Sequence, residues 1–143
     1  MLEVVTKSPR ETQKVAQMLA RTLLKSHFNT IALEGELGAG KTTFVQGFAG
    51  ALGIREKIQS PTFVLLKIYK IKKGRVRHLI HIDCYRLKSA EALIHLGLKN
   101  LLEDKDAIIL IEWADRVRKF LPKNTVWVRF KHGSNHRERI LKL

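Results

Sequence analysis

Residues 35–42 read Gly35-Glu36-Leu37-Gly38-Ala39-Gly40-Lys41-Thr42. Two glycines separated by four residues and followed by Lys and Thr are typical of a loop whose backbone amides fold around a phosphate chain. A helix that begins at such a loop directs the positive end of its dipole at the same anion. The pattern predicts a nucleotide-phosphate site, in which Lys41 reaches the terminal phosphates and Thr42 offers its hydroxyl to a bridging magnesium ion.

The segments on either side of this loop have the periodicities that it requires. Residues 30–34 form a short apolar run that predicts a buried strand ending at Gly35. Residues 40–52 carry large apolar side chains at a spacing of four, which predicts a helix that ends before Gly53. The sequence therefore predicts a strand, a glycine turn and a helix in succession.

The rest of the chain predicts further strands and helices of an α/β fold. Ser8 followed by Pro9 is typical of a helix start. The further elements that we expect are a hairpin of residues 63–71 and 76–83, short helical segments at 89–96 and 98–102, a strand at 107–111 buried on both faces, and a final hairpin of 125–130 and 137–143. We expect a single domain over residues 1–143.

Composition excludes several classes of protein. The chain has 143 residues, 45% of them hydrophobic, which is enough for one core. Its single cysteine, Cys84, excludes an internal disulfide, and its apolar runs are far shorter than the ~20 residues of a membrane helix. The first residues lack the basic and apolar segments of a secretory signal. We therefore expect a cytoplasmic protein with no membrane contact.

The net charge of +14 is concentrated in two segments. Residues 67–88 carry eight basic and one acidic residue, and residues 114–143 carry nine and two, so each segment has a net charge of +7. Such blocks attract nucleic acid or an acidic protein surface, but they are also typical of solvated faces without a partner. We expect an anionic partner for the basic residues that crowd one hairpin tip, namely Lys70, Lys72, Lys73, Arg75 and Arg77.

Two carboxylates end apolar runs and are candidates for phosphate chemistry. Asp83 follows residues 79–82, and Glu112 follows residues 107–111. Ligands of open α/β folds gather at the carboxyl edge of the sheet, so one carboxylate there can hold a metal ion and the other can orient water. Seen alone, each is more often an ordinary strand-end carboxylate, but the nearby phosphate loop favours the functional interpretation.

Three other side chains near these carboxylates have simpler interpretations. His81 lies two residues before Asp83, and we treat it as a structural residue or as a partner of the site residues, because the histidines lack a transition-metal spacing. Cys84 is expected to fill apolar space rather than act as a nucleophile. Trp113 is either a core residue or a lid against the nucleotide, with the core interpretation favoured.

Four motifs, in this order, resemble those of the TsaE family, formerly called YjeE, which are small bacterial ATPases of threonylcarbamoyladenosine tRNA modification. The resemblance runs from about Ser8 to Leu121. It rests on residues 33–44 (Leu-Glu-Gly-Glu-Leu-Gly-Ala-Gly-Lys-Thr-Thr-Phe), 60–63 (Ser-Pro-Thr-Phe), 81–87 (His-Ile-Asp-Cys-Tyr-Arg-Leu) and 111–114 (Ile-Glu-Trp-Ala). The ordered set is much more specific than the phosphate loop alone.

The resemblance implies an α/β fold like that of phosphate-loop (P-loop) NTPases, with a mixed β-sheet flanked by helices, and a set of site residues. ATP would be held by Gly38, Ala39, Gly40, Lys41, Thr42 and Thr43, and Mg²⁺ by Thr42, Asp83 and Glu112. The loop at 60–63 would behave like a nucleotide-sensing switch, in which Thr62 supplies a hydroxyl near the terminal phosphate. The catalytic residues would then be Lys41, Glu112 and Thr62.

The resemblance also implies partners. The family acts with TsaD and TsaB, and TsaD transfers the threonylcarbamoyl group to tRNA, so contact with tRNA would come through the complex. ATP hydrolysis by the small subunit would support repeated turnover of that complex. The transfer itself is not assigned to this chain.

Two other classes of function are compatible with parts of the sequence. A similar phosphate loop serves small-molecule kinases, although we find no arginine-rich lid or acceptor segment in the chain. The charge alone is compatible with a non-catalytic nucleic-acid-binding module. The pattern does not distinguish ATP from GTP.

Overall fold

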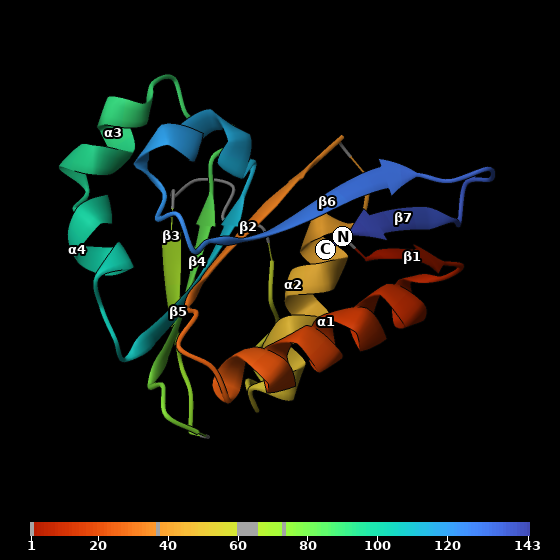
Figure 1. Cartoon of the computed structure of the whole chain (residues 1–143), viewed down its shortest axis with the longest axis horizontal. Helices are drawn as coiled ribbons and strands as arrows, with labels where there is room; N and C mark the ends of the chain where they lie inside the picture. Colours follow the sequence, from red (N-terminus) through yellow and green to blue (C-terminus); the bar gives the residue numbers. More distant parts are fainter. Residues whose placement is uncertain (1, 37, 60–65, 73) are drawn as a thin grey trace.

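The computed structural model describes residues 2–36, 38–59, 66–72 and 74–143. In chain order its elements are β1 (Glu3–Thr6), α1 (Pro9–Leu24), β2 (Thr30–Gly35), α2 (Lys41–Ala51), β3 (Leu66–Lys70), β4 (His78–Asp83), α3 (Ala90–His95), α4 (Leu98–Leu102), β5 (Ala107–Glu112), the 3-10 helix η1 (Ala114–Phe120), β6 (Val126–His132) and β7 (Arg139–Lys142). The strands form one sheet in the order β1-β7-β6-β2-β5-β4-β3 (Figure 1).

The centre of the sheet is parallel and its edges are antiparallel. Strands β6, β2, β5 and β4 are joined by parallel pairing, whereas β3, β7 and β1 each pair antiparallel with a neighbour. The β3–β4 and β6–β7 pairs are the two expected hairpins, although residues 63–65 of the first lie outside the described residues. The predicted α/β fold with a mixed, helix-flanked sheet is confirmed.

Helix α1 begins as its sequence predicts. The Ser8 hydroxyl accepts a hydrogen bond from the Glu11 amide at 3.2 Å, and Pro9 occupies the first helical position. The Glu11 carboxylate in turn accepts from the Lys7 amide at 3.3 Å. The first contact satisfies an amide that the first helical turn leaves without a partner, and the second ties the residue before the cap to the helix.

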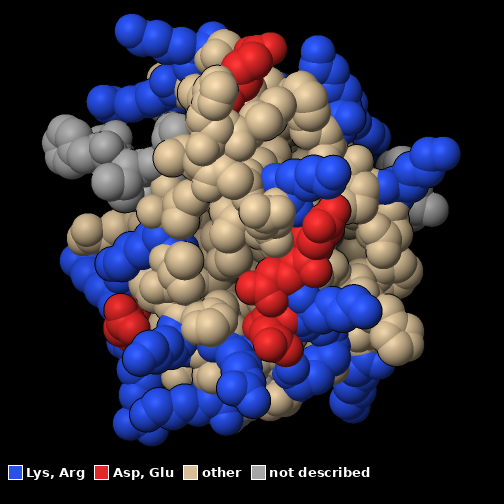
Figure 2. Space-filling view, turned by 90° about the vertical axis from the view of Figure 1, so that its left-hand side faces the viewer, with Lys and Arg blue, Asp and Glu red and all other residues tan. Residues whose placement is uncertain are grey.

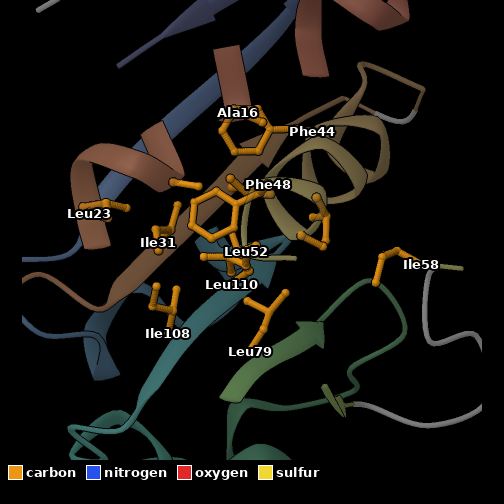
Figure 3. Close-up of a cluster of buried hydrophobic side chains, with 14 of the residues drawn as sticks. Ala16, Leu23, Ile31, Phe44, Phe48, Leu52, Ile58, Leu79, Ile108 and Leu110 are labelled. Atoms are coloured by element: carbon orange, nitrogen blue, oxygen red, sulfur yellow. The ribbon is translucent and has the colours of Figure 1, made fainter. Parts of the chain in front are cut away.

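Helices cover both faces of the sheet and divide the apolar core in two. Helices α1 and α2 cover one face, and α3, α4 and η1 lie on the other (Figure 1). Strand β5 is buried along its whole length, as its apolar sequence predicts. On the α2 face, Phe48 of the helix and Leu52, which directly follows it, lie close to Leu110 of β5 and Leu79 of β4, and Phe44 lies beside Ala16 of α1 (Figure 3). This packing fixes α2, and therefore the loop before it, against the sheet.

Close packing of α1 on α2 depends on Gly47. A Cβ atom there would lie 2.6 Å from both the Cα and the carbonyl oxygen of Gln13, too close for any side chain unless α1 moves. We expect Gly47→Ala to lower the free energy of unfolding by about 1–3 kcal/mol. Gly50 on the same helix has nothing within 4 Å of its Cβ position, so Gly50→Ala should raise it by about 0.5–1 kcal/mol. Urea denaturation measures both, and equal effects of the two substitutions would contradict the packing argument.

Two described elements were not expected from the sequence. Strand β1 joins the sheet only through β7, and the backbones of Leu2 and Leu143 exchange hydrogen bonds of 3.1 and 2.8 Å. The two ends of the chain therefore lie side by side (Figure 1). The other element is the 3-10 helix η1, whose sequence has only a few apolar residues at helical spacing.

The basic hairpin tip differs from expectation at Arg75. Its guanidinium donates to the carbonyl oxygen of Leu23, in the last turn of α1, at 3.2 Å and to that of Phe28, beyond the helix, at 2.9 Å. Carbonyls at a helix C-terminus attract a cation, so this charge is used within the fold. Arg75 therefore has partners within the fold, while its side chain stays exposed and its expected contact with an anionic partner stays a prediction; Lys73 lies outside the described residues.

Candidate functional site

The phosphate-loop pattern occupies the turn between β2 and α2. Gly38 and Gly40 have φ angles of 74° and 100°, in the left-handed region that favours glycine, and Gly40 is the residue that caps α2. The Ala39 amide donates to the Glu36 carbonyl at 3.1 Å, which tightens the turn. The loop therefore has the backbone that the glycine spacing predicts, at the N-terminus of an 11-residue helix.

Lys41, the first residue of α2, turns its ammonium back toward this loop. Its Nζ donates to the carbonyl oxygens of Gly35 at 2.6 Å and Glu36 at 2.8 Å, and lies 4.0 Å from the centre of the Trp113 ring. Burial lowers the pKa of Lys41, while Glu112, Asp83, Asp115 and Glu36 act in the opposite direction. The loop thus holds a buried cation at the head of α2.

Thr42 and Glu112 join the loop to strand β5. The Thr42 hydroxyl donates to Glu112 Oε1 at 3.1 Å, and the other carboxylate oxygen, Oε2, lies 2.6 Å from His81 Nε2. Both Glu112 and His81 are buried, with 2% and 0% of their surfaces exposed. The expected carboxylate is therefore in place, and His81 is its partner rather than a metal ligand.

Asp83 ends β4 directly beside Glu112. The two residues are register partners across the parallel β4–β5 pair, so they reach the same carboxyl edge of the sheet. Asp83 is only partly buried, and its Oδ1 accepts a hydrogen bond from the Tyr85 amide at 2.9 Å. The structure thus brings the two predicted carboxylates to one edge but gives them different surroundings.

Trp113 is partly buried and packs against the core on the η1 face, as the favoured interpretation expected, and its ring also borders the site. It is the one residue other than glycine with a positive φ angle, 56°, among those that the structure describes. Its ring lies 5.0 Å from the ring of Tyr85 and 5.7 Å from the Arg116 guanidinium, and Lys41 lies over it. The left-handed backbone turns this indole from the end of β5 toward the phosphate loop, as the lid interpretation requires.

The remaining expected residues have mixed outcomes. Ala39 is buried, and Thr43 is partly buried on the first turn of α2. Thr62 lies outside the described residues, so its expected place near a terminal phosphate stays a prediction. Cys84 is buried among apolar side chains, and burial, with a smaller contribution from Asp83, raises the pKa of its thiol to about 12. The thiol is therefore protonated at neutral pH, as expected of an apolar filler.

Two arginines at the site were missed by sequence reasoning. Arg139 of β7 donates to the Gly38 carbonyl at 3.2 Å, and Arg116 of η1 donates to the Tyr85 carbonyl at 2.6 Å. The motif at residues 81–87 contains Tyr85, the partner of Arg116, but it did not identify Arg116 itself. Nothing in the sequence placed Arg139, because only the pairing of β7 with β6 brings it to the loop.

The side chains of Thr42, Asp83 and Glu112 are the kinds of donor that suit magnesium held together with a phosphate ligand. A hydroxyl and two carboxylates are hard oxygen donors of the kind that Mg²⁺ prefers, and Mg²⁺ is usually held by one or two carboxylates together with substrate phosphates. Within the described ranges, no cluster of three or more His, Cys, Asp and Glu side chains forms a complete metal cage. The residues present therefore suit a metal that arrives with a phosphate ligand.

Comparison with known proteins identifies the family of this chain. Residues 6–140 match the family described as "Threonylcarbamoyl adenosine biosynthesis protein TsaE". The chain belongs to the TsaE family. A TsaE protein of Treponema pallidum is 38% identical over 127 residues, which cover 89% of each chain. A TsaE protein of Bacillus subtilis is 36% identical over 134 residues, covering 93% of this chain and 80% of that one.

A solved structure supports the fold of this TsaE family member. The crystal structure of Bacillus subtilis YdiB superposes with a TM-score of 0.77 at 32% sequence identity, covering 98% of this chain and 82% of that chain. The resemblance noted from the four motifs is thus confirmed over nearly the whole length. In the described part of the chain, no helix has the length and apolarity needed to cross a membrane.

Proposed function

We propose that this protein binds and hydrolyses ATP with Mg²⁺, and thereby supports repeated turnover of a TsaD–TsaB transferase in tRNA threonylcarbamoyladenosine biosynthesis. The pathway follows from its family. One observation carries the ATPase assignment, namely the hydrogen bond from Thr42, at the head of α2, to the buried Glu112 at the end of β5. It joins a phosphate-binding loop to a carboxylate, the pair of groups that phosphoryl transfer to water requires.

Each residue of the candidate site has a separate task in this proposal. The loop amides of residues 38–43 bind phosphate oxygens, and Lys41 turns from its carbonyl partners toward the terminal phosphates. Thr42 and Asp83 provide oxygens for Mg²⁺, which neutralises charge on the phosphates when it is bound. Glu112 orients the attacking water and, through Thr42, remains close to the metal. Trp113 covers the loop and excludes bulk solvent.

The face that carries α3 and α4 supports a protein partner. Figure 2 shows an uncharged area on this face, bordered by a row of Asp and Glu side chains and surrounded at the margins mostly by Lys and Arg. Ile94 and Leu96 are 41% and 51% exposed there, beside a hollow of about 390 Å³ lined by α3, α4 and the residues after η1. An apolar centre with a charged rim is the usual composition of a protein interface.

The proposed function predicts that phosphate release depends on Mg²⁺ and that association with partners depends on nucleotide. The measurements are ATP hydrolysis with and without EDTA, and co-purification with TsaD and TsaB with and without ATP. Phosphate should be released free, and ATP should change recovery of the complex. Transfer of labelled phosphate to a metabolite would instead indicate a kinase, and salt-sensitive tRNA binding indifferent to ATP would indicate a nucleic-acid-binding module.

A further inference from the structure

His81 is the only described side chain, apart from Thr42, that an observed hydrogen bond joins to the Glu112 carboxylate. It lies on β4, in register with Leu110 of β5, so its ring reaches diagonally across the pair to Glu112 two residues further on. The contact is short, at 2.6 Å, and the imidazole is wholly buried. Glu112 is therefore held at two points, from β4 through Oε2 and from α2 through Oε1.

The other ring nitrogen of His81, Nδ1, argues against a role limited to filling the core. His81 Nδ1 is buried and has no hydrogen-bond partner among the described residues. Because a carboxylate only accepts hydrogen bonds, we assign the ring proton to Nε2, which donates it to Glu112. A buried imidazole that leaves one nitrogen without a partner would be replaced by an apolar residue if its only task were to fill the core.

We infer that His81 is a positioning residue, which fixes the direction of the Glu112 carboxylate so that Oε1 faces the phosphate loop. A glutamate side chain has three rotatable bonds, and the Thr42 hydroxyl alone does not fix the rotation of the carboxylate. A charge-assisted bond from a rigid ring on the neighbouring strand fixes it. The effect on turnover rests on the proposed function, whereas the hydrogen bond and its effect on Glu112 do not.

Three substitutions distinguish positioning from filling. In glutamine the amide nitrogen lies three bonds from Cβ, the same as Nε2 in histidine, whereas in asparagine it lies one bond closer to the backbone and does not reach Glu112. We expect His81→Asn and His81→Leu to lower kcat for ATP hydrolysis about 100-fold with little change in nucleotide affinity. His81→Gln should restore most of the activity, and His78→Gln, at the start of the same strand, should leave it unchanged.

The dependence on Glu112 is tested by a double-mutant cycle. If His81 acts through Glu112, His81→Leu should have no further effect on kcat in a Glu112→Gln background. A merely structural role would lower kcat by the same factor in both backgrounds, and that result would overturn the inference. So would an Asn variant as active as the Gln variant.

A readout without nucleotide keeps this test separate from the proposed function. In ¹⁵N-histidine-labelled protein, NMR should show His81 with its proton on Nε2, exchanging slowly with water, and Glu112→Ala should accelerate that exchange. A proton on Nδ1, or exchange unaffected by Glu112→Ala, would overturn the inference. If the wild-type protein fails to hydrolyse ATP in the presence of its partners, the proposed function fails, while the NMR result still decides whether His81 holds Glu112.

Discussion

Lys41→Ala should weaken ATP binding about 100-fold and abolish measurable hydrolysis. Lys41 is 5% exposed and presents the only ammonium that the structure places within hydrogen-bonding distance of loop carbonyls in the described residues. Removing it leaves the loop glycines and the helix dipole in place but deletes the charge that the terminal phosphates require. Isothermal titration with ATP and a phosphate-release assay measure the two effects.

Folding should survive this substitution, because the lysine contacts carbonyl groups at the edge of the loop rather than the apolar core. Loss of a buried cation also removes its desolvation cost, which lowers the pKa of Lys41 in the folded protein. The control is Lys14→Ala, at an exposed position of α1, which should leave binding and hydrolysis unchanged. Wild-type hydrolysis by Lys41→Ala in a clean preparation would refute the proposed site.

The sequence predicted those parts of the site for which the local pattern is sufficient. The glycine spacing predicted the loop, and the uninterrupted apolar run before Glu112 predicted a central strand. Asp83 could be placed beside Glu112 because parallel strands share their carboxyl edge, and the register confirms it. These predictions needed only the period of the side chains and a general property of parallel sheets.

Other features depend on tertiary contacts that no local pattern contains. Trp113 has the short apolar neighbourhood of a core residue, and only its left-handed backbone brings the ring to Lys41. Arg75 belongs to a basic segment, but the position of α1 gives it carbonyl partners. His81 was expected to be structural or a partner of the site, yet its spacing from Asp83 did not reveal that its partner is Glu112. Each of these depends on which strands and helices become neighbours.

Glu112 and Asp83 should respond differently to neutralisation, because their surroundings differ. Asp83 has a short side chain and is partly exposed, which suits a metal ligand. We expect Asp83→Asn to weaken binding of Mg²⁺-ATP as well as turnover. The exposed carboxylate Glu103 provides the control, since Glu103→Gln removes a charge of the same sign away from the site.

Glu112→Gln should leave ATP binding nearly normal and suppress hydrolysis about 100-fold or more. The amide keeps the shape of the side chain, and its oxygen still accepts from His81 Nε2 while its nitrogen faces the Thr42 hydroxyl, which also accepts. What is lost is the negative charge that orients the attacking water in a poorly solvated site. The variant should therefore trap the protein in its ATP-bound assembly, so that TsaD and TsaB co-purify with it for longer than with the wild type.

Nucleotide affinity and phosphate release are to be measured for Asp83→Asn and Glu112→Gln side by side. Because the Thr42 contact also brings Glu112 close to the metal donors, the comparison decides between its two duties: if Glu112→Gln loses binding more severely than Asp83→Asn, Glu112 is the principal metal ligand and the assigned roles are reversed.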